Sequence, residues 1–318
     1  MRIGAHVSIA GALPQAVARA LALGCECLQI FIGNPRQWRP VDYPRADLDQ
    51  FRERRAASGL DPLVAHASYL VSPASTDRAM RARAAGSLTR AMRVIEELDG
   101  FGVVTHLGSR GTGTPGGAVR RVAATARAVL RATARARLLL ENSAGGTLGG
   151  TFEELRDILA ALGGDARVGA CLDTAHLFAA GWDLRAADGV AAMLDRFERV
   201  VGLERLWLFH LNDSRAALGS RLDRHENIGR GLIGREGFRA LLAEPRVAGL
   251  AGVLEVPGYD GHGPDRRNLA TLRALRGTPE QGAKRGGVRR APSVTRAPSV
   301  TRAPASRRGA KPDSSPSR

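Results

Sequence analysis

The chain has 318 residues, of which 44% are hydrophobic, and its formal net charge is +16. This length suits one large α/β barrel or two small domains. No apolar run approaches the roughly 20 residues that span a bilayer, and no signal-peptide pattern follows Met1, so we expect a cytoplasmic protein with no membrane partner. The cysteines Cys25, Cys27 and Cys171 are too few for a disulfide framework and indicate buried thiols.

Short apolar segments alternate with helical patterns along residues 1–276. The predicted strands are residues 2–6, 27–32, 62–66, 102–106, 137–141, 168–173, 206–210 and 252–255. Apolar residues recur at helical spacing in residues 13–23, 47–58, 77–98, 118–134, 152–162, 190–200, 235–242 and 265–275. Eight β–α alternations predict one parallel (β/α)8 TIM barrel, with an open doubly wound sheet as the alternative. No Gly-x-Gly-x-x-Gly fingerprint follows the first strand, which argues against a dinucleotide fold.

Residues 277–318 differ from the barrel domain in composition. They hold ten basic and two acidic residues, a net charge of +8 that leaves +8 for residues 1–276. The hexapeptide Arg-Ala-Pro-Ser-Val-Thr occurs at residues 290–295 and again at 296–301. Because the segment is rich in Pro, Ser, Ala and Arg and has no apolar periodicity, it predicts a disordered basic tail. Such a tail is either an auxiliary arm on DNA phosphates or a dispensable extension.

Most predicted strands end in a residue type that binds metal ions. The candidate ligands at or beyond strand ends are His66, His106, Glu141, Asp173, His176, His210, Asp223, His225 and Glu255. In a TIM barrel the carboxyl ends of the strands and the loops after them form one face, which carries the active site. A lone histidine at a strand end is usually structural, but five of the seven histidines occur here together with four carboxylates. We therefore expect the nine side chains to meet in one cleft.

The composition of this set points to metal ions. Four carboxylates in one cleft repel one another and raise one another's pKa unless cations are present. Imidazole and carboxylate without thiolate suit zinc or manganese at a catalytic site, and nine ligands suit two or three ions. Clustered divalent ions lower the pKa of bound water and stabilise the attacking and leaving oxygens at phosphorus. The pattern predicts metal-assisted phosphodiester hydrolysis, for which a basic barrel would bind the phosphates.

Several motifs, in this order, resemble the endonuclease IV family of apurinic/apyrimidinic (AP) endonucleases. They are Gly-Ala-His-Val-Ser at 4–8, Asn-Pro-Arg-Gln-Trp at 34–38, His-Ala-Ser-Tyr-Leu at 66–70, Glu-Asn-Ser-Ala-Gly at 141–145, Leu-Asp-Thr-Ala-His at 172–176, His-Leu-Asn-Asp-Ser at 210–214 and Gly-Ser-Arg-Leu-Asp-Arg-His-Glu-Asn-Ile-Gly at 219–229. The resemblance covers residue 1 to about residue 275 at family-like spacing and excludes the tail. It implies a zinc-dependent endonuclease of base excision repair that acts on double-stranded DNA containing abasic sites. We expect a monomer.

The resemblance also implies roles for the nine candidate ligands. Three zinc ions per chain are implied, with Mn²⁺ as an alternative at one site. The implied ligands are His66 and His106 for the first ion, Asp173, His210 and Glu255 for the second, His176, Asp223 and His225 for the third, and Glu141 as the bridge between the first two. Glu141 and Glu255 would be catalytic in this sense. The implied reaction cuts 5′ to the abasic sugar and leaves a 3′-hydroxyl and a 5′-deoxyribose phosphate.

Three residues match positions that contact DNA in the family: Arg36, Tyr69 and Leu70. Arg36 and Tyr69 would enter the base stack or fill the gap when the abasic nucleotide flips out, a movement that costs least where the base is missing. We expect Trp38 to pack beneath this loop and His6 to lie on the polar floor of the barrel.

The chain departs from the family pattern at a few loop positions. Leu107 stands where the family usually has proline, Arg110 where a histidine is common, and Val256 where threonine is usual. None of these departures removes a candidate ligand, so they concern loop geometry and rate.

Two other functions explain part of the pattern. A sugar isomerase or epimerase on the same barrel would also place His, Glu and Asp around one or two ions. It offers no reason for His176 with Asp223 and His225 as a further ligand set, or for the Arg36 loop. A non-enzymatic nucleic-acid binder explains the charge but not the nine ligands. Metal stoichiometry separates these functions, since about three ions per chain favour the nuclease and one favours the isomerase.

Overall fold

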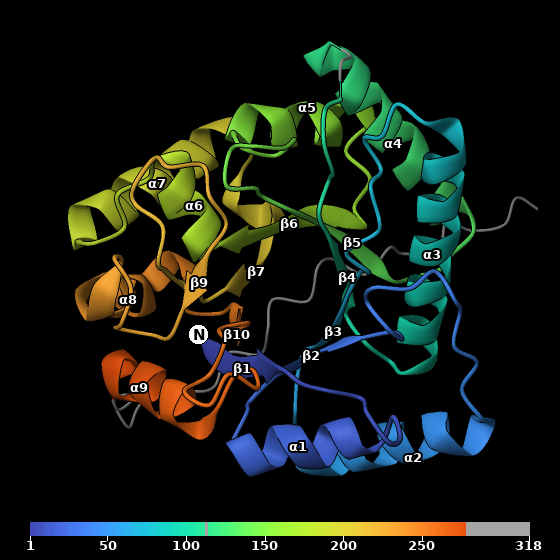
Figure 1. Ribbon diagram of the computed structural model, residues 1–318, viewed down its shortest axis with the longest axis horizontal. Coiled ribbons are helices and arrows are strands. Elements are labelled where there is room, and N and C mark those ends of the chain that lie inside the picture. The colour runs from blue at the N-terminus through green and yellow to red at the C-terminus, as the bar shows by residue number, and fades with distance from the viewer. Residues whose placement is uncertain (112–113, 278–318) are drawn as a thin grey trace, which may run out of the picture.

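Eight parallel strands form a closed barrel in the computed structural model, which describes residues 1–111 and 114–277 (Figure 1). The barrel strands are β1 (Arg2–His6), β2 (Leu28–Phe31), β3 (Leu63–His66), β4 (Gly102–Thr105), β5 (Arg137–Glu141), β6 (Val168–Asp173), β7 (Leu206–His210) and β10 (Ala251–Leu254). They pair in chain order, and β10 closes the barrel against β1. The predicted (β/α)8 barrel is confirmed and the open-sheet alternative is wrong. The predicted tail lies outside the described residues from residue 278 onward.

Helices follow one another around the outside of the barrel, and α9 returns beside α1 (Figure 1), where Arg266 Nε donates to Ala22 O at 2.5 Å. The outer helices are α1 (Gln15–Leu23), α2 (Arg45–Ser58), α3 (Arg78–Glu97), α4 (Pro115–Arg131), α5 (Phe152–Ala161), α7 (Ala187–Val200), α8 (Gly234–Ala243) and α9 (Arg266–Arg276), with short 3-10 turns at Leu203–Arg205 and Pro245–Val247. All eight predicted helices are present. Among the described helices, none combines the length and the apolar character needed to cross a membrane.

The helix ends differ from the predicted ones by at most three residues, and α4 shows why. It begins at Pro115 rather than at residue 118, because the Thr114 side chain caps it by accepting a hydrogen bond from Gly117 N at 3.1 Å. Gly116 and Gly117 follow this cap, and they carry no apolar side chain from which a helical period could be detected.

Buried apolar side chains fill the barrel interior and the layer between strands and helices. The inner cluster is Cys27, Val64, Val104, Leu139, Cys171, Leu208, Ala251 and Val253. On β1, Gly4 faces this cluster, and a Cβ there would lie 2.0 Å from Cys27 O, so only glycine fits. The three cysteines are buried and free, as predicted.

Three short elements at the carboxyl end of the barrel were not predicted. Helix α6 (Thr174–Ala180) directly follows β6, and the Asp173 side chain caps it by accepting from His176 N at 2.9 Å. Strands β8 (Asp213–Ser214) and β9 (His225–Glu226) pair antiparallel beyond β7. These elements place His176 and His225, two of the candidate ligands, beside the strand ends.

Candidate metal centre

The nine candidate ligands are brought together at the carboxyl end of the barrel. His106 and Glu255 directly follow β4 and β10, because the strand ladders end one residue earlier than predicted. Neighbouring imidazole rings lie close, with centroids 5.2 Å apart for His66 and His106 and 5.7 Å apart for His176 and His225. A cleft of about 1030 Å³ opens over this group of side chains.

Glu141 lies at the centre of the group and is fully buried. Its Oε2 atom is 3.2 Å from His66 Nε2 and 3.4 Å from His106 Nδ1. Its Oε1 atom is 3.0 Å from His210 Nδ1 and 3.6 Å from His176 Nδ1. Burial opposes ionisation, but His106 and His210 hold the pKa of Glu141 well below its ordinary value. Each oxygen of one carboxylate thus faces a different pair of histidines.

His210 links Glu141 to Glu255 and Asp173. His210 Nδ1 lies 3.2 Å from Glu255 Oε2 and 3.9 Å from Asp173 Oδ2. His210 and Asp173 are fully buried, and burial raises the free energy of a carboxylate that has no cationic partner. This arrangement requires either protonated histidines or cations.

His176, Asp223 and His225 form a second group beside the first. One oxygen of Asp223 lies 3.2 Å from His176 Nε2, and the other lies 3.2 Å from His225 Nε2. Burial lowers histidine pKa values, but Asp173 and Asp223 outweigh it. They raise the pKa of His176 to about 10 and that of His225 to about 9. In the absence of metal, protons would occupy the positions that cations could take.

Backbone carbonyls orient three of these histidines. His66 Nδ1 donates to Ala67 O at 2.7 Å, and His176 Nδ1 donates to Asn142 O at 2.9 Å. The Nε2 atoms of both rings are left to face carboxylates. His225 Nδ1 lies 3.5 Å from Glu255 O. A ring nitrogen fixed in this way leaves the other nitrogen free to bind a metal ion, as is usual for metal-binding histidines.

The donor set fits divalent metal ions. Candidate ligand atoms of His66, Glu141, His210 and Glu255 lie within 4.8 Å of one another, and so do those of Asp173, His176 and His225. His225 Nε2 is buried and, although 3.2 Å from Asp223 Oδ1, it makes no well-aligned hydrogen bond among the described residues, so a bound ion would satisfy it. Imidazole and carboxylate donors suit zinc. These two groups divide the residues differently from the three predicted ligand sets, so the division among individual ions stays a prediction.

Buried amides, which sequence reasoning missed, hold the carboxylates in place. Asn142 Oδ1 accepts from Asp173 N at 2.6 Å. Asn212 Nδ2 donates to Asp173 Oδ2 at 2.5 Å, and Asn212 Oδ1 accepts from Glu255 N at 2.8 Å. The only sequence signal is that Asn142 directly follows Glu141, and Asn212 follows His210 by two residues, within motifs already noted.

Asp213 anchors the loop that follows His225. This carboxylate is fully buried and accepts hydrogen bonds from the backbone amides of Ser214, Gly229, Gly231, Ile233 and Gly234, at 2.8 to 3.3 Å. A Cβ on Gly231 would lie 2.5 Å from the carboxylate, so the loop needs glycine there. Asp213 thus fixes the segment that follows β9, the strand that begins with His225.

The predicted DNA contacts lie around the same cleft. Arg36 is exposed and Tyr69 is 59% exposed, and both line the cleft. Their loops are joined, since Tyr69 N donates to Pro35 O at 3.1 Å. Leu70 is half-buried next to Tyr69. The structure brings Arg36 and Tyr69 to the rim of the cleft, while their contact with DNA stays a prediction.

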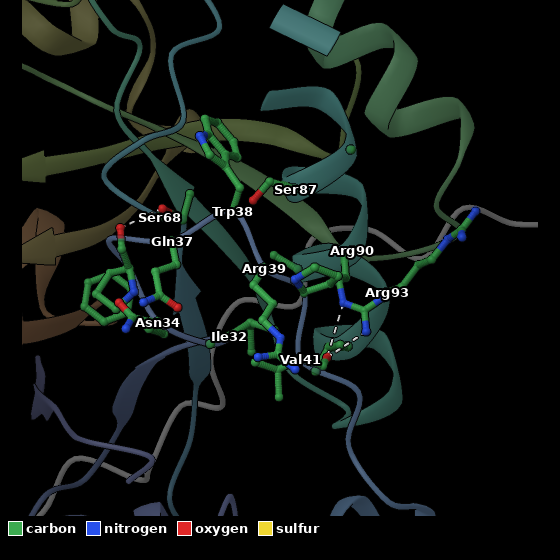
Figure 2. Close-up of a pocket in the computed structure, with 18 of the residues that line it drawn as sticks. Ile32, Asn34, Gln37, Trp38, Arg39, Val41, Ser68, Ser87, Arg90 and Arg93 are labelled. Carbon is green, nitrogen blue, oxygen red and sulfur yellow. Dashed lines mark hydrogen bonds between the residues drawn. The ribbon is translucent and has the colours of Figure 1, made fainter. Parts of the chain in front are cut away.

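Behind the Arg36 loop lies a second cavity of about 750 Å³ between this loop and α3 (Figure 2). Trp38 lies there near Ser87 of α3, and it is partly buried against the hydrophobic core, which confirms its predicted packing role. Arg90 of α3 donates to Val41 O at 2.7 Å and so ties the far end of the loop to the helix. The packing of Trp38 and the hydrogen bond from Arg90 therefore hold the loop that carries Arg36 against α3 and the core.

The predicted position of His6 is wrong. It ends β1 at the same face as the candidate ligands, not on the barrel floor, and its Nδ1 lies 3.3 Å from Glu255 Oε1. The rule that places strand ends on the active face applies to β1 as to the other strands.

Two departures from the family pattern have clear structural roles. Leu107 is buried in the hydrophobic core. Arg110 donates from Nε to Glu154 Oε1 at 2.8 Å, while Glu154 Oε2 accepts from Gly149 N at 2.8 Å. Arg110 therefore braces the loop that follows β5, whose last residue is Glu141.

Comparison with known proteins places this centre in a family. A family model described as a xylose isomerase-like TIM barrel matches residues 17–278. A protein of Methanoculleus marisnigri named "Probable endonuclease 4" is 43% identical over 279 residues, which cover 86% of this chain and 99% of that protein. The chain belongs to the endonuclease IV family. The predicted family and the predicted enzyme class, a hydrolase of the AP endonuclease type, are thereby confirmed.

Solved structures agree with this endonuclease IV assignment. Endonuclease IV from Thermus thermophilus is 38% identical with a TM-score of 0.77, covering 86% of this chain and 98% of that one. A D-tagatose 3-epimerase-like protein has a TM-score of 0.64 at 19% identity, covering 87% of this chain and 96% of that one. At that identity, the likeness shows the barrel fold alone.

Proposed function

We propose that this endonuclease IV family member is a zinc-dependent AP endonuclease of base excision repair. It hydrolyses the phosphodiester 5′ to an abasic site in double-stranded DNA and leaves a 3′-hydroxyl and a 5′-deoxyribose phosphate. The observation that carries the proposal is the meeting of five histidines and four carboxylates at the carboxyl end of the barrel, where six of the nine line the cleft that also holds Arg36 and Tyr69. The endonuclease 4 relatives support the same conclusion.

The proposed zinc ligands are the nine residues identified in the sequence. They are His66 and His106 for one ion, Asp173, His210 and Glu255 for a second, His176, Asp223 and His225 for a third, and Glu141 between the first two. When bound, zinc supplies charge stabilisation at the phosphate and a nucleophile from water at neutral pH. Glu141 suits a bridging position because its two oxygens face different histidines, Oε2 toward His66 and Oε1 toward His210.

The chain's own residues bind and orient the substrate. Arg36 supplies a positive charge at the rim, where it would attract the DNA backbone. The exposed ring of Tyr69 is held at the rim by the Tyr69–Pro35 backbone hydrogen bond, so it can fill a gap in the base stack. Flipping costs least where the base is missing, which gives selectivity for abasic sites without reading a base.

The group of His176, Asp223 and His225 favours this function over a sugar isomerase. An isomerase would need one or two ions, and this group lies beyond the ligands that such a centre requires. The described barrel shares its fold with the epimerase-like protein, but a shared fold carries no argument about function.

Incision of a duplex with one abasic site tests the proposal. Zinc-loaded protein, chelator-stripped protein and Glu141→Gln are compared with Glu53→Gln, which makes the same change on the exposed surface of α2. We expect incision that leaves a 3′-hydroxyl extendable by a polymerase, with loss of more than about a hundredfold on stripping or in Glu141→Gln. Glu53→Gln should cut normally. If fully zinc-loaded protein makes no cut, the proposal is wrong and sugars become the next substrates to test.

A further inference from the structure

Gln29 is a fully buried glutamine on β2, among the proposed zinc ligands. Its side chain makes three contacts, all with residues of the site. Gln29 Nε2 donates to Glu255 Oε1 at 2.6 Å, and Gln29 Oε1 lies 3.0 Å from His210 Nε2. Gln29 Nε2 also lies 3.0 Å from His6 Nδ1. Neither the nine candidate ligands nor the DNA contacts include this residue.

The chemistry of the partners fixes the orientation of this amide. The Glu255 carboxylate can only accept, so the nitrogen of Gln29 must face it and the oxygen must face His210. An amide oxygen can only accept as well, so His210 Nε2 carries a hydrogen and donates it. His210 Nδ1, 3.0 Å from Glu141 Oε1, is then the nitrogen left for a metal ion, and it carries a proton when no ion is bound.

Gln29 thus does for His210 what backbone carbonyls do for other histidines of the site. Ala67 O accepts from His66, and Asn142 O accepts from His176. For His210 the acceptor is a side-chain carbonyl from another strand. The same amide holds one oxygen of Glu255 and leaves Oε2, which lies 3.2 Å from His210 Nδ1, on the ligand side.

His6 is the second imidazole near this amide, with Nδ1 3.0 Å from Gln29 Nε2 and 3.3 Å from Glu255 Oε1. The first contact needs a lone pair on Nδ1 and the second needs a hydrogen there, so one tautomer cannot make both hydrogen bonds. The other ring nitrogen is Nε2. Among the described residues this buried Nε2 atom has no hydrogen-bond partner, and His6 lines the cleft. The amide therefore sets the orientation of one imidazole, His210, and one carboxylate, Glu255.

We propose that Gln29 is a positioning residue of the zinc site, which fixes His210 and Glu255 in the orientation that metal binding requires. The inference rests on the proposed function for the identity of the ion. A purely structural role explains Gln29 less well, since β2 is buried and a methionine would fill similar space without the cost of burying an amide.

The first test compares Gln29→Met with Gln50→Met, the same change on the exposed surface of α2. Zinc affinity is measured by competition with a chelator, and folding is measured by thermal unfolding. We expect Gln29→Met to remain folded, to lose about 10- to 100-fold in zinc affinity, and to lower kcat on abasic duplex with little change in KM. Gln50→Met should match the wild type. Wild-type zinc affinity in folded Gln29→Met would overturn the proposal.

A second measurement does not depend on the variant folding. In zinc-loaded wild type, nitrogen-15 NMR should show a protected hydrogen on His210 Nε2, because Gln29 Oε1 accepts it. A His210 that binds zinc through Nε2, or whose Nε2 hydrogen exchanges freely with solvent, would overturn the proposal. Neither zinc affinity nor NMR involves DNA, so failure of wild type to cut abasic DNA would contradict the proposed function and leave this test intact.

Discussion

The side-chain amide of Asn212 donates a hydrogen bond of 2.5 Å to Asp173 Oδ2. Both residues are fully buried, and the oxygen of the same amide accepts from the backbone nitrogen of Glu255. Asn212 therefore sets the spacing between two proposed ligands of one zinc ion, although it binds none itself. The role of such supporting amides is poorly predicted from the sequence, because only the structure shows which groups they contact.

Asn212→Leu should weaken zinc binding without emptying the site. The substitution keeps the volume but removes the donor to Asp173 and the acceptor for Glu255 N. We expect a loss of about 10- to 100-fold in zinc affinity, together with about 1–3 kcal/mol in unfolding free energy from the unpaired backbone amide. Chelator competition and denaturant unfolding measure the two effects. Unchanged zinc affinity would show that Asp173 is held by its other contacts alone.

Asp223→Asn should remove one ion and spare the others. Asp223 contacts His176 and His225 at 3.2 Å, and within the described residues no hydrogen bond or ion pair joins it directly to His66, Glu141, His210 or Glu255. We expect elemental analysis to fall from about three zinc ions per chain to about two. Asp188→Asn on the exposed surface of α7 is the matched control. A count that stays at three would contradict the role of Asp223, and a wild-type count of one would favour an isomerase.

Arg36→Ala and Tyr69→Ala should affect DNA binding and leave the zinc content unchanged. Both side chains lie at the rim of the cleft, and a stacked aromatic contributes roughly 1–3 kcal/mol per base. We expect each variant to raise KM for abasic duplex by about tenfold or more. Arg54→Ala, on the exposed surface of α2, should behave as wild type. A change in kcat alone, with KM unaltered, would place these residues outside substrate binding.

The metal-free protein should become less stable as pH rises. Although burial lowers them, the pKa values of His176 and His225 are raised to about 10 and about 9 by Asp173 and Asp223. A folded-state pKa above the ordinary 6.5 gives stability that is complete below pH 6.5 and is lost as pH rises to about 10. Urea unfolding of metal-free protein at pH 6.5, 8 and 10 should show this decline. His176→Gln should flatten it, and an equally steep decline in that variant would contradict the assignment.

The architecture and the nine candidate ligands could be predicted because both follow short-range patterns. Eight apolar segments alternate with amphipathic ones. His66 and Glu141 each stand at the end of an apolar segment, so the sequence itself shows that they end strands. Helix α6 escaped prediction because six of its seven residues are buried, so it has no polar face to reveal a helical period.

The supporting amides could not be predicted, because their partners are distant in the chain. Gln29 and Glu255 are 226 residues apart, and no residue near Gln29 in the sequence indicates that Glu255 is its partner. Asp213 resembles any polar loop residue until the five backbone amides around it are seen. A ligand is recognisable by its residue type at a strand end, whereas a positioning residue is defined only by what it contacts.

The basic tail gives the last prediction, which rests on charge alone. Residues 278–318 carry ten basic and two acidic residues and lie outside the described structure. Each phosphate contact contributes about −0.9 to the slope of log K against log salt on duplex DNA. If the tail contacts phosphates, its deletion should flatten this slope and weaken binding to intact and abasic duplex equally. The kcat should not change, because every proposed ligand lies in the barrel. Fluorescence anisotropy at several salt concentrations measures the slope, and an identical slope after deletion would show that the tail is dispensable for DNA binding.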